Sequence, residues 1–257
     1  GGLGAGLRPS PAGRNRPGQT ARPSPAPPLL GYRNPMPELS PVRIVLVRPE
    51  EPGNVGAVAR ILKNFGMNHL VLVAPAYDRP ERAFTFAHGA EDVLESADYA
   101  ATLDEALRGT ADAWATTRRR GRKRSGGRSV RDAAVLAWDA AKGGRSVAWV
   151  FGPESRGLAT DEVARCGGRV SIPTAPEQPS LNLSQAVAVC AYETYVARLS
   201  PGGAGRRIAL LEQRNELYAH LESALLGIGF LHPQTAAPRM SALRAILEHL
   251  LARQPVE

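Results

Sequence analysis

Five short apolar runs recur along the chain, each five to seven residues long. They are rich in Val, Ile, Leu and Ala and lie at 41–47, 69–73, 111–116, 146–151 and 169–173. Nearly continuous apolar runs of this length are typical of strands buried on both faces of a parallel sheet. The sequence therefore predicts a sheet of five strands.

Segments with apolar residues at helical spacing separate these runs, at 55–65, 80–97, 129–141 and from Ser180 onwards. Strands that alternate with helices predict an α/β domain with a mostly parallel sheet. In the first helix, we expect Asn54 to be the N-cap and Gly66 to follow the C-cap, since these residue types favour those positions.

The last predicted strand is joined to a long helix through a loop that contains Pro173, Pro176 and Pro179. Ser180 follows the last proline and is the predicted N-cap of the helix. Asn182 lies in the first turn, where unpaired amides can bind polar ligands. The pattern fits both a capped core helix and a ligand site, and leaves the two interpretations open.

The first helix carries a second face of a different kind, formed by Gly56, Arg60 and Lys63. Bare backbone beside two cations is a plausible seat for a phosphate or a ribose. A solvated charged face explains the same pattern equally well.

The chain carries an excess of basic residues, and many of them lie in one segment. The formal net charge is +8, and eight basic residues but no acidic one lie between Asp112 and Asp132. A block of like charge with three glycines predicts a mobile cationic loop that captures a nucleic-acid backbone, here with Arg119, Arg120, Arg122, Lys123, Arg124 and, from the first helix, Lys63.

Composition also limits the class of protein. Cys166 and Cys190 are the only cysteines, and their contexts favour free thiols in a cytoplasmic protein. The residue pattern contains no Cys/His cluster for zinc and no phosphate-binding glycine loop after the first strand. It also contains no apolar run of the roughly 20 residues needed to cross a bilayer, so we expect no membrane partner.

The two ends differ in composition from the middle. Residues 1–40 are rich in Pro, Gly and Arg and predict a disordered basic leader. Residues 41–200 form the predicted α/β domain. Residues 201–257 predict a helical extension that is too short for a core of its own, so its helices must pack on the domain, on a second subunit or on a substrate.

Three segments together resemble a known family. They are Asn54-Val-Gly-Ala-Val-Ala-Arg60, Phe151-Gly-Pro-Glu-Ser-Arg-Gly157-Leu, and Ile172-Pro followed by Ser180-Leu-Asn-Leu-Ser-Gln-Ala. In this order they are similar to the three motifs of the SPOUT-class, TrmH-like RNA 2′-O-ribose methyltransferases. Within that family, the chain is most similar to the enzymes that act on nucleotide 32 of the tRNA anticodon loop.

The resemblance implies a sheet with a C-terminal trefoil knot, S-adenosylmethionine as cofactor, tRNA as substrate, and a homodimer with sites at its interface. It implies catalysis by Arg60 with Asn54 beside it. It also implies a cofactor site made of Thr116, Thr117, Arg118, Gly152, Ile172, Ser180, Leu181 and Asn182. One departure is the run Thr117-Arg118-Arg119-Arg120, where the family usually has a small residue and then one arginine.

Two further readings remain open at this point. A related enzyme that methylates ribosomal RNA would carry the same motifs. A catalytically silent RNA-binding protein could share the scaffold, although it would have no need for the cofactor-facing residues. In either enzyme, Arg60 is better suited to electrostatic stabilisation of the 2′-oxygen than to base catalysis, because a guanidinium stays charged at neutral pH.

Overall fold

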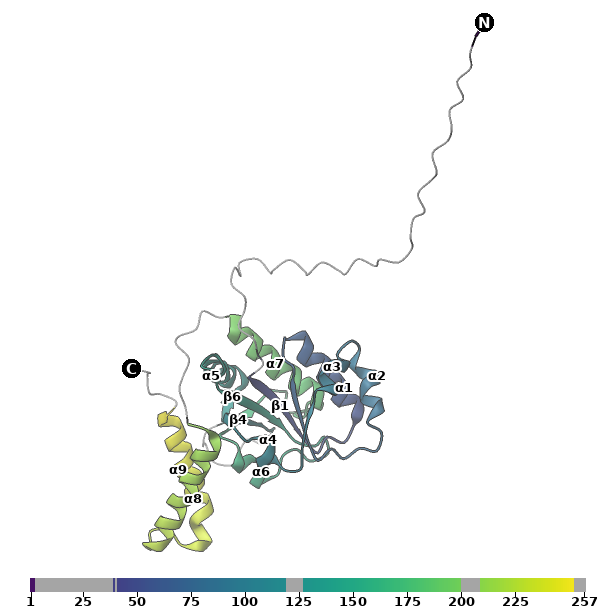
Figure 1. The fold of residues 1–257 in the computed structure, drawn as a ribbon. Helices are drawn as coiled ribbons and strands as arrows, with labels where there is room; N and C mark the ends of the chain where they lie inside the picture. Colours follow the sequence, from purple (N-terminus) through teal and green to yellow (C-terminus); the bar gives the residue numbers. More distant parts are fainter. Residues whose placement is uncertain (3–38, 40, 119–126, 200–208, 252–257) are drawn as a thin grey trace. The chain divides into compact units, whose positions relative to one another are not determined.

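The computed structural model describes residues 1–2, 39, 41–118, 127–199 and 209–251 (Figure 1). Its contacts divide the chain into Gly1–Met36 and Pro37–Glu257, and the fold is that of the second unit. The predicted leader lies almost wholly outside the described residues. Leu39 is fully buried, and its carbonyl oxygen accepts a hydrogen bond from the Val42 amide.

The strands of the described residues form one seven-stranded sheet in which every pairing is parallel. The order across the sheet is β3-β2-β1-β6-β4-β7-β5. The strands are β1 Val42–Val47, β2 His69–Val73, β3 Asp98–Ala100, β4 Thr110–Thr116, β5 Gly127–Ser129, β6 Ser146–Phe151 and β7 Gly168–Ser171. The five predicted strands are all present, and the α/β class is confirmed.

Two short edge strands, β3 and β5, were not predicted. The helices are α1 Pro52–Asn64, α2 Glu81–Ala87, α3 Glu91–Glu95, α4 Leu103–Ala106, α5 Val130–Lys142, α6 Thr160–Arg165, α7 Leu183–Leu199, α8 Leu211–Gly227 and α9 Pro233–Leu251. The single helix predicted at 80–97 is wrong, because His88 (φ +43°) and Gly89 (φ +85°) break it into α2 and α3.

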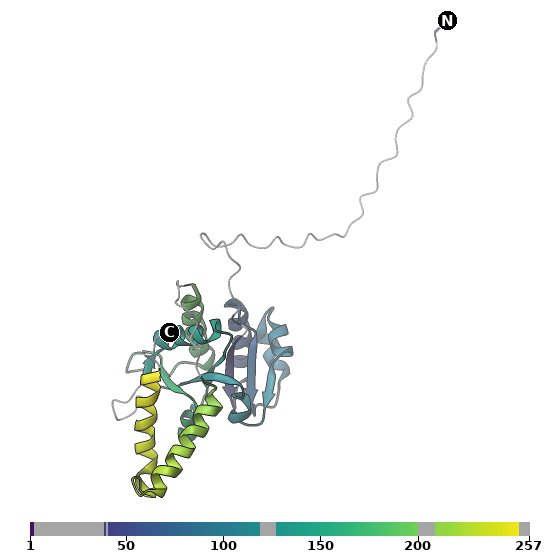
Figure 2. The same ribbon diagram turned by 60° about the vertical axis from the view of Figure 1, so that its left-hand side comes forward.

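Helices cover both faces of the sheet (Figures 1 and 2). On one face, α1, α5 and α7 pack against side chains such as Ile44, Leu72 and Trp149. On the other, α4 and α6 pack against the alternate positions, among them Val45 and Val150. Burial on both faces explains why the central strands read as continuous apolar runs.

The extension forms a hairpin of two antiparallel helices, α8 and α9, called the C-terminal hairpin below (Figure 2). It has a small apolar cluster of its own around Leu231, Ala236 and Met240. Leu211 at the start of α8 is buried with the main sheet. Of the three packing partners that the sequence allowed, the structure thus shows the hairpin against its own domain.

Candidate functional site

A cavity of about 310 Å³ opens at the carboxyl ends of three neighbouring strands, β6, β4 and β7. In parallel α/β sheets, this edge is where ligands bind. All eight residues predicted for the cofactor site line it: Thr116, Thr117, Arg118, Gly152, Ile172, Ser180, Leu181 and Asn182. Segments more than 60 residues apart in sequence therefore line one cavity. The role of these residues in cofactor binding stays a prediction.

The loop after β1 is held to the loop after β6. Because β1 and β6 pair in parallel, with Leu46 opposite Phe151, their following loops leave the sheet side by side. The Glu154 carboxylate accepts hydrogen bonds from the amides of Glu50 (2.9 Å) and Glu51 (3.3 Å) and from Asn54 Nδ2 (2.9 Å).

A second carboxylate makes the reciprocal connection. Glu50 accepts from the Ser155 amide (3.1 Å) and from Ser155 Oγ (2.6 Å). Each loop thus donates to a carboxylate of the other, and charge-assisted bonds of this kind are stronger than neutral ones. Sequence analysis missed Glu50 and Ser155, because a pairing between distant loops leaves no local pattern.

Asn54 continues this network towards the third motif. Its Oδ1 accepts from Asn182 Nδ2 at 3.0 Å, and Asn182 Oδ1 accepts from the Ser184 amide at 2.9 Å. The Asn182 amide in turn donates to Gln185 Oε1 at 3.3 Å. The side chain of Asn182 thus caps the second residue of α7, and Gln185 caps the amide of Asn182. Glu50, Asn54, Glu154, Ser155 and Asn182 are called the Glu154 network below.

Both predicted N-caps are therefore wrong. Asn182, not Ser180, caps α7, and Ser180 is an exposed residue of the preceding loop. α1 begins three residues earlier than predicted, with Glu51 as its N-cap, and Asn54 lies inside its first turn. Because Asn54 does not cap the helix, its side chain can form the hydrogen bond to Glu154. Gly66 follows the C-cap Phe65 with φ +67°, as predicted.

At Gly152 the backbone of the following loop approaches too closely for a residue with a side chain. A Cβ there would lie 2.2 Å from the Leu158 amide nitrogen and 2.3 Å from the Gly157 carbonyl carbon. The loop is closed by a hydrogen bond from the Gly157 amide to the Pro153 carbonyl oxygen at 2.8 Å. This tight turn brings Glu154 and Ser155 to the cavity.

An ion pair also stabilises the loop between β6 and α6. Arg48 Nη2 lies 2.5 Å from Glu162 Oε1, and Glu162 is almost fully buried. Glu162 also accepts from the Ala159 amide at 2.7 Å, so the pair ties the end of β1 to the start of α6. Arg48 has a φ of +47°, a conformation that is unusual for a residue with a side chain.

Arg60 lies elsewhere. It is an exposed residue of α1, and it is not among the described residues that line the cavity. Six residues separate it from Asn54, which corresponds to a rise of about 9 Å and a turn of about 120° around the helix. The two residues predicted for catalysis thus face different directions in one chain.

The basic face of α1 also differs from expectation. Gly56 is buried under α2, where an added Cβ would lie 2.0 Å from the Ala83 carbonyl oxygen, so it offers no bare backbone to a ligand. Lys63 Nζ lies 2.7 Å from Asp92 of α3. The other predicted RNA-binding residues, Arg119, Arg120, Arg122, Lys123 and Arg124, lie outside the described residues.

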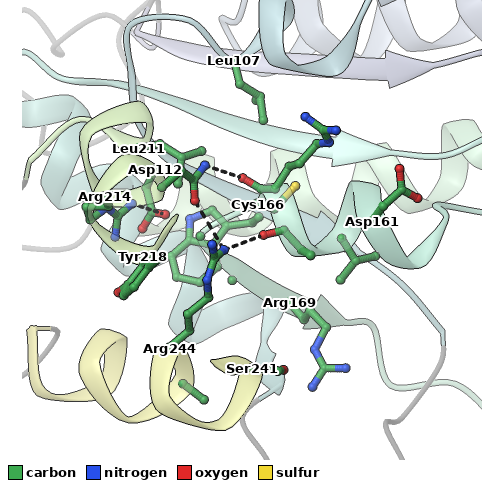
Figure 3. Close-up of a pocket in the computed structure, with 18 of the residues that line it drawn as sticks. Leu107, Asp112, Asp161, Cys166, Arg169, Leu211, Arg214, Tyr218, Ser241 and Arg244 are labelled. Atoms are coloured by element: carbon green, nitrogen blue, oxygen red, sulfur yellow. Dashed lines mark hydrogen bonds and ion pairs between the residues drawn. The ribbon is translucent and has the colours of Figure 1, made fainter. Parts of the chain in front are cut away.

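A second, larger cavity lies between the C-terminal hairpin and the sheet (Figure 3). At its edge, Arg214 of α8 donates to the Ala111 carbonyl oxygen (2.8 Å) and to Asp112 Oδ1 (3.0 Å). Arg244 of α9 donates to the Ala164 carbonyl oxygen at 3.0 Å. Basic and acidic side chains both line this cavity, so it lacks the single-sign charge of a nucleic-acid groove.

Comparison with known proteins places this fold and site in a class. Residues 41–192 match the model of the SpoU rRNA Methylase family, and this match includes all three motifs. The chain therefore belongs to the SpoU methylase family and is a methyltransferase with the SPOUT fold. None of the described helices is both long and apolar enough to span a membrane.

Within the family, the relatives are more specific. The chain is 37% identical over 221 residues to the tRNA (cytidine/uridine/adenosine-2′-O-)-methyltransferase TrmJ of Pseudomonas aeruginosa strain UCBPP-PA14, covering 81% of this chain and 86% of that one. It is 35% identical to the tRNA (cytidine/uridine-2′-O-)-methyltransferase TrmJ of Escherichia coli K12, covering 81% and 87%.

Solved structures agree. TrmJ from Z. mobilis ZM4 superposes with a TM-score of 0.63 at 34% identity, over 81% of this chain and 89% of that one. An AdoMet-bound rRNA methyltransferase from Sinorhizobium meliloti has a TM-score of 0.51 at 22% identity, over 64% of this chain and 59% of that one. The latter likeness concerns the fold alone.

Proposed function

We propose that the protein methylates a ribose 2′-hydroxyl in tRNA, at nucleotide 32 of the anticodon loop, with S-adenosylmethionine as methyl donor. The convergence of eight predicted residues on one cavity beside the Glu154 network supports this proposal most strongly. The similarity to TrmJ proteins over four fifths of the chain supports tRNA as the substrate class.

The cavity fits a bent nucleoside cofactor. Its volume lies at the lower end of the roughly 300–1,000 Å³ usual for ligand pockets. Apolar side chains such as Ile172 and Leu181 can cover a base, while loop backbone and small polar side chains can hydrogen-bond its edge. The charged residues among the described lining residues are Glu154, Arg118 and Arg156, so the lining carries both signs of charge. S-adenosylmethionine, when bound, supplies a methyl group on a cationic sulfur.

The chain's own residues would then align the reacting groups. Asn54 and Asn182, fixed in orientation by Glu154 and Ser184, hold the cavity wall in place. Arg60 would stabilise developing negative charge on the 2′-oxygen and bind an adjacent phosphate. The proton of the hydroxyl would leave through a phosphate oxygen or water. Alignment of this kind can lower a barrier by about 7–11 kcal/mol.

We also propose that the active form is a homodimer. Arg60 is exposed and outside its own chain's cavity, so a second copy that places its cavity near Arg60 would complete the site. Mixing Arg60→Ala with Asn182→Ala protein tests this. Recovery of activity on mixing supports shared sites, and the absence of recovery from a confirmed mixed dimer contradicts them. The trefoil knot remains a prediction from the resemblance.

Mass spectrometry of nucleosides tests the reaction. Purified protein and S-adenosylmethionine are incubated with unmodified tRNA and, in parallel, with ribosomal RNA. A 2′-O-methylated nucleoside that maps to position 32 supports the proposal. Methylation of ribosomal RNA alone would move the substrate to the second reading, and methylation of neither by protein that binds no cofactor would favour the silent RNA binder.

A further inference from the structure

An exposed aromatic ring lies against the start of α1. Phe86 of α2 keeps 44% of its surface exposed although its ring contacts the backbone of another helix. A Cβ at Gly53 would lie 3.3 Å from Phe86 Cδ2 and Cε2, which is tight van der Waals contact. One edge of the ring is therefore fixed against α1, and much of the remainder faces solvent.

The two helices also pack closely beside this contact. At Gly56, an added Cβ would lie 2.9 Å from Phe86 Cβ and 2.0 Å from the Ala83 carbonyl oxygen. Only a residue without a side chain fits at Gly56, so the backbones of α1 and α2 approach closely beside Phe86.

Phe86 occupies the same face of α1 as Arg60. Gly53, Gly56 and Arg60 are spaced at i, i+3 and i+7, which places them in one row along the helix. Gly53, against which the ring lies, and Arg60 are separated by about 10 Å along the axis. Asn54 of the Glu154 network is in the same first turn that the ring covers.

We propose that the exposed face of Phe86 is a stacking platform for an unpaired RNA base close to the target ribose. This rests on the proposed function in taking RNA as the substrate. A ribose whose 2′-oxygen is held by Arg60 lies on the same face of α1 as the ring, about 10 Å further along the helix axis.

An unpaired base is the occupant that this geometry favours. Bases in single-stranded loops expose both ring faces and are recognised by stacking on aromatic side chains. The ring has charged neighbours of both signs: Arg60 follows on α1, and Arg82, one turn earlier on α2, faces Glu51 at 3.9 Å. A protein partner would more naturally need a broad apolar patch than one ring among charged neighbours.

The chain offers a matched control on the same helix. Phe84 is 41% exposed, but it does not approach Gly53 or Gly56 in the close contacts made there. Phe86→Leu removes the aromatic face and keeps apolar packing on α1, and Phe84→Leu makes the same change at a ring that is not among the nearest contacts of Gly53 and Gly56. Phe86→Trp restores an aromatic face.

The experiment uses an anticodon stem-loop RNA with 2-aminopurine in the loop, because stacking quenches the fluorescence of this base. We expect wild type, Phe84→Leu and Phe86→Trp to quench it. We expect Phe86→Leu to quench less and to raise the KM for tRNA about tenfold, in line with base–aromatic stacking, with an unchanged KM for S-adenosylmethionine.

The proposal would be overturned if Phe86→Leu and Phe84→Leu showed the same quenching and the same KM for tRNA. So would loss of self-association in Phe86→Leu, measured by light scattering, because the ring would then be a contact between protein chains. Quenching by a wild-type protein that methylates no tRNA would support stacking while refuting the proposed reaction. Methylation without quenching at any loop position would refute stacking alone.

Discussion

Asn54 and Glu154, which are 100 residues apart in sequence, are joined by a hydrogen bond of 2.9 Å from Nδ2 to Oε1. This bond gives the Asn54 amide a direction. Its nitrogen faces Glu154, so its oxygen faces Asn182, whose own oxygen then faces the first turn of α7. One carboxylate thereby sets the orientation of a chain of amides that links all three motifs.

Glu154→Gln should disturb this chain without changing its shape. A glutamine has one acceptor oxygen for the three donors that Glu154 now accepts, so its own NH₂ must meet another donor. We expect kcat/KM for tRNA methylation to fall by a factor of about 100 and the free energy of unfolding by about 1–3 kcal/mol. Steady-state kinetics and urea denaturation measure the two effects.

The control is Ser155→Ala, which removes one donor to Glu50 and leaves the bonds of Glu154 intact. It should lower kcat/KM far less. If Glu154→Gln and Ser155→Ala lower kcat/KM by the same factor, the orientation of the amides does not depend on the carboxylate.

Asn182→Ala should destabilise α7, because it removes the side chain that accepts from the Ser184 amide. Loss of an N-cap costs about 1 kcal/mol, which corresponds to a fall in Tm of about 2–4 °C for a domain of this size. Ser180→Ala, the same kind of change two residues earlier, should leave Tm within about 1 °C of wild type. Thermal unfolding of both variants would show the reverse order if Ser180 were the cap after all.

Arg214→Met should weaken attachment of the C-terminal hairpin. Arg214 and Asp112 are both largely buried, with side-chain exposures of 7% and 13%. Burial raises the pKa of Asp112, and Arg214 opposes that shift. Removing the arginine leaves a buried carboxylate unpaired, a change that typically costs about 3–5 kcal/mol.

The double variant Asp112→Asn/Arg214→Met distinguishes the loss of the ion pair from the cost of leaving one buried charge unpaired. We expect it to be more stable than Arg214→Met alone, because no charge is then left buried. Urea denaturation at pH 7 gives the comparison. A double variant that loses the sum of both single losses would show that the two residues act independently.

The sequence predicted the sheet well because its five central strands bury both faces and so read as apolar runs. β3 and β5 escaped prediction since three residues such as Asp98–Ala100, exposed at an edge, have no such run. The break between α2 and α3 depends on the left-handed backbone of His88, which the helical pattern around it does not reveal.

The cavity could be predicted only in part. The resemblance supplied its lining residues, but cap preferences could not distinguish Ser180 from Asn182, because both residue types favour that position. The choice depends on Asn54 and Glu154, which hold Asn182 from outside the helix. Likewise Gly56 looked like open backbone beside two cations, and only the packing of α2 shows it to be a contact between helices.

Arg60→Ala should lower kcat for methylation by at least about 100-fold, as removal of a group that stabilises an oxyanion does. The Kd for S-adenosylmethionine should stay within about twofold, because Arg60 is outside the cavity. Arg60→Lys should recover little activity, since it lacks the planar guanidinium that binds an oxygen and a phosphate together. Single-turnover methylation and calorimetry check this, and loss of cofactor binding in folded Arg60→Ala would contradict it.

The two cysteines should make the protein less stable in alkaline solution. Both are free and buried, and burial raises the pKa of Cys190 to about 12 from an ordinary 9.0 and that of Cys166 in the same direction. The unfolded chain therefore loses its thiol protons at a lower pH than the folded chain. The contribution to stability is complete below about pH 9 and falls as the pH rises towards 12, by about 1.4 kcal/mol per pH unit for each thiol.

Urea denaturation from pH 7.5 to 10.5 measures this effect, with Cys190→Ala as the matched variant. Lysine and tyrosine residues titrate in both proteins, so their effects cancel in the difference. We expect the gap in unfolding free energy between wild type and Cys190→Ala to be constant up to about pH 8.5 and then to narrow, because only wild type loses the Cys190 contribution. A gap that stays constant to pH 10.5 would mean that Cys190 ionises equally well in the folded protein and is not shielded from water by the α7 core.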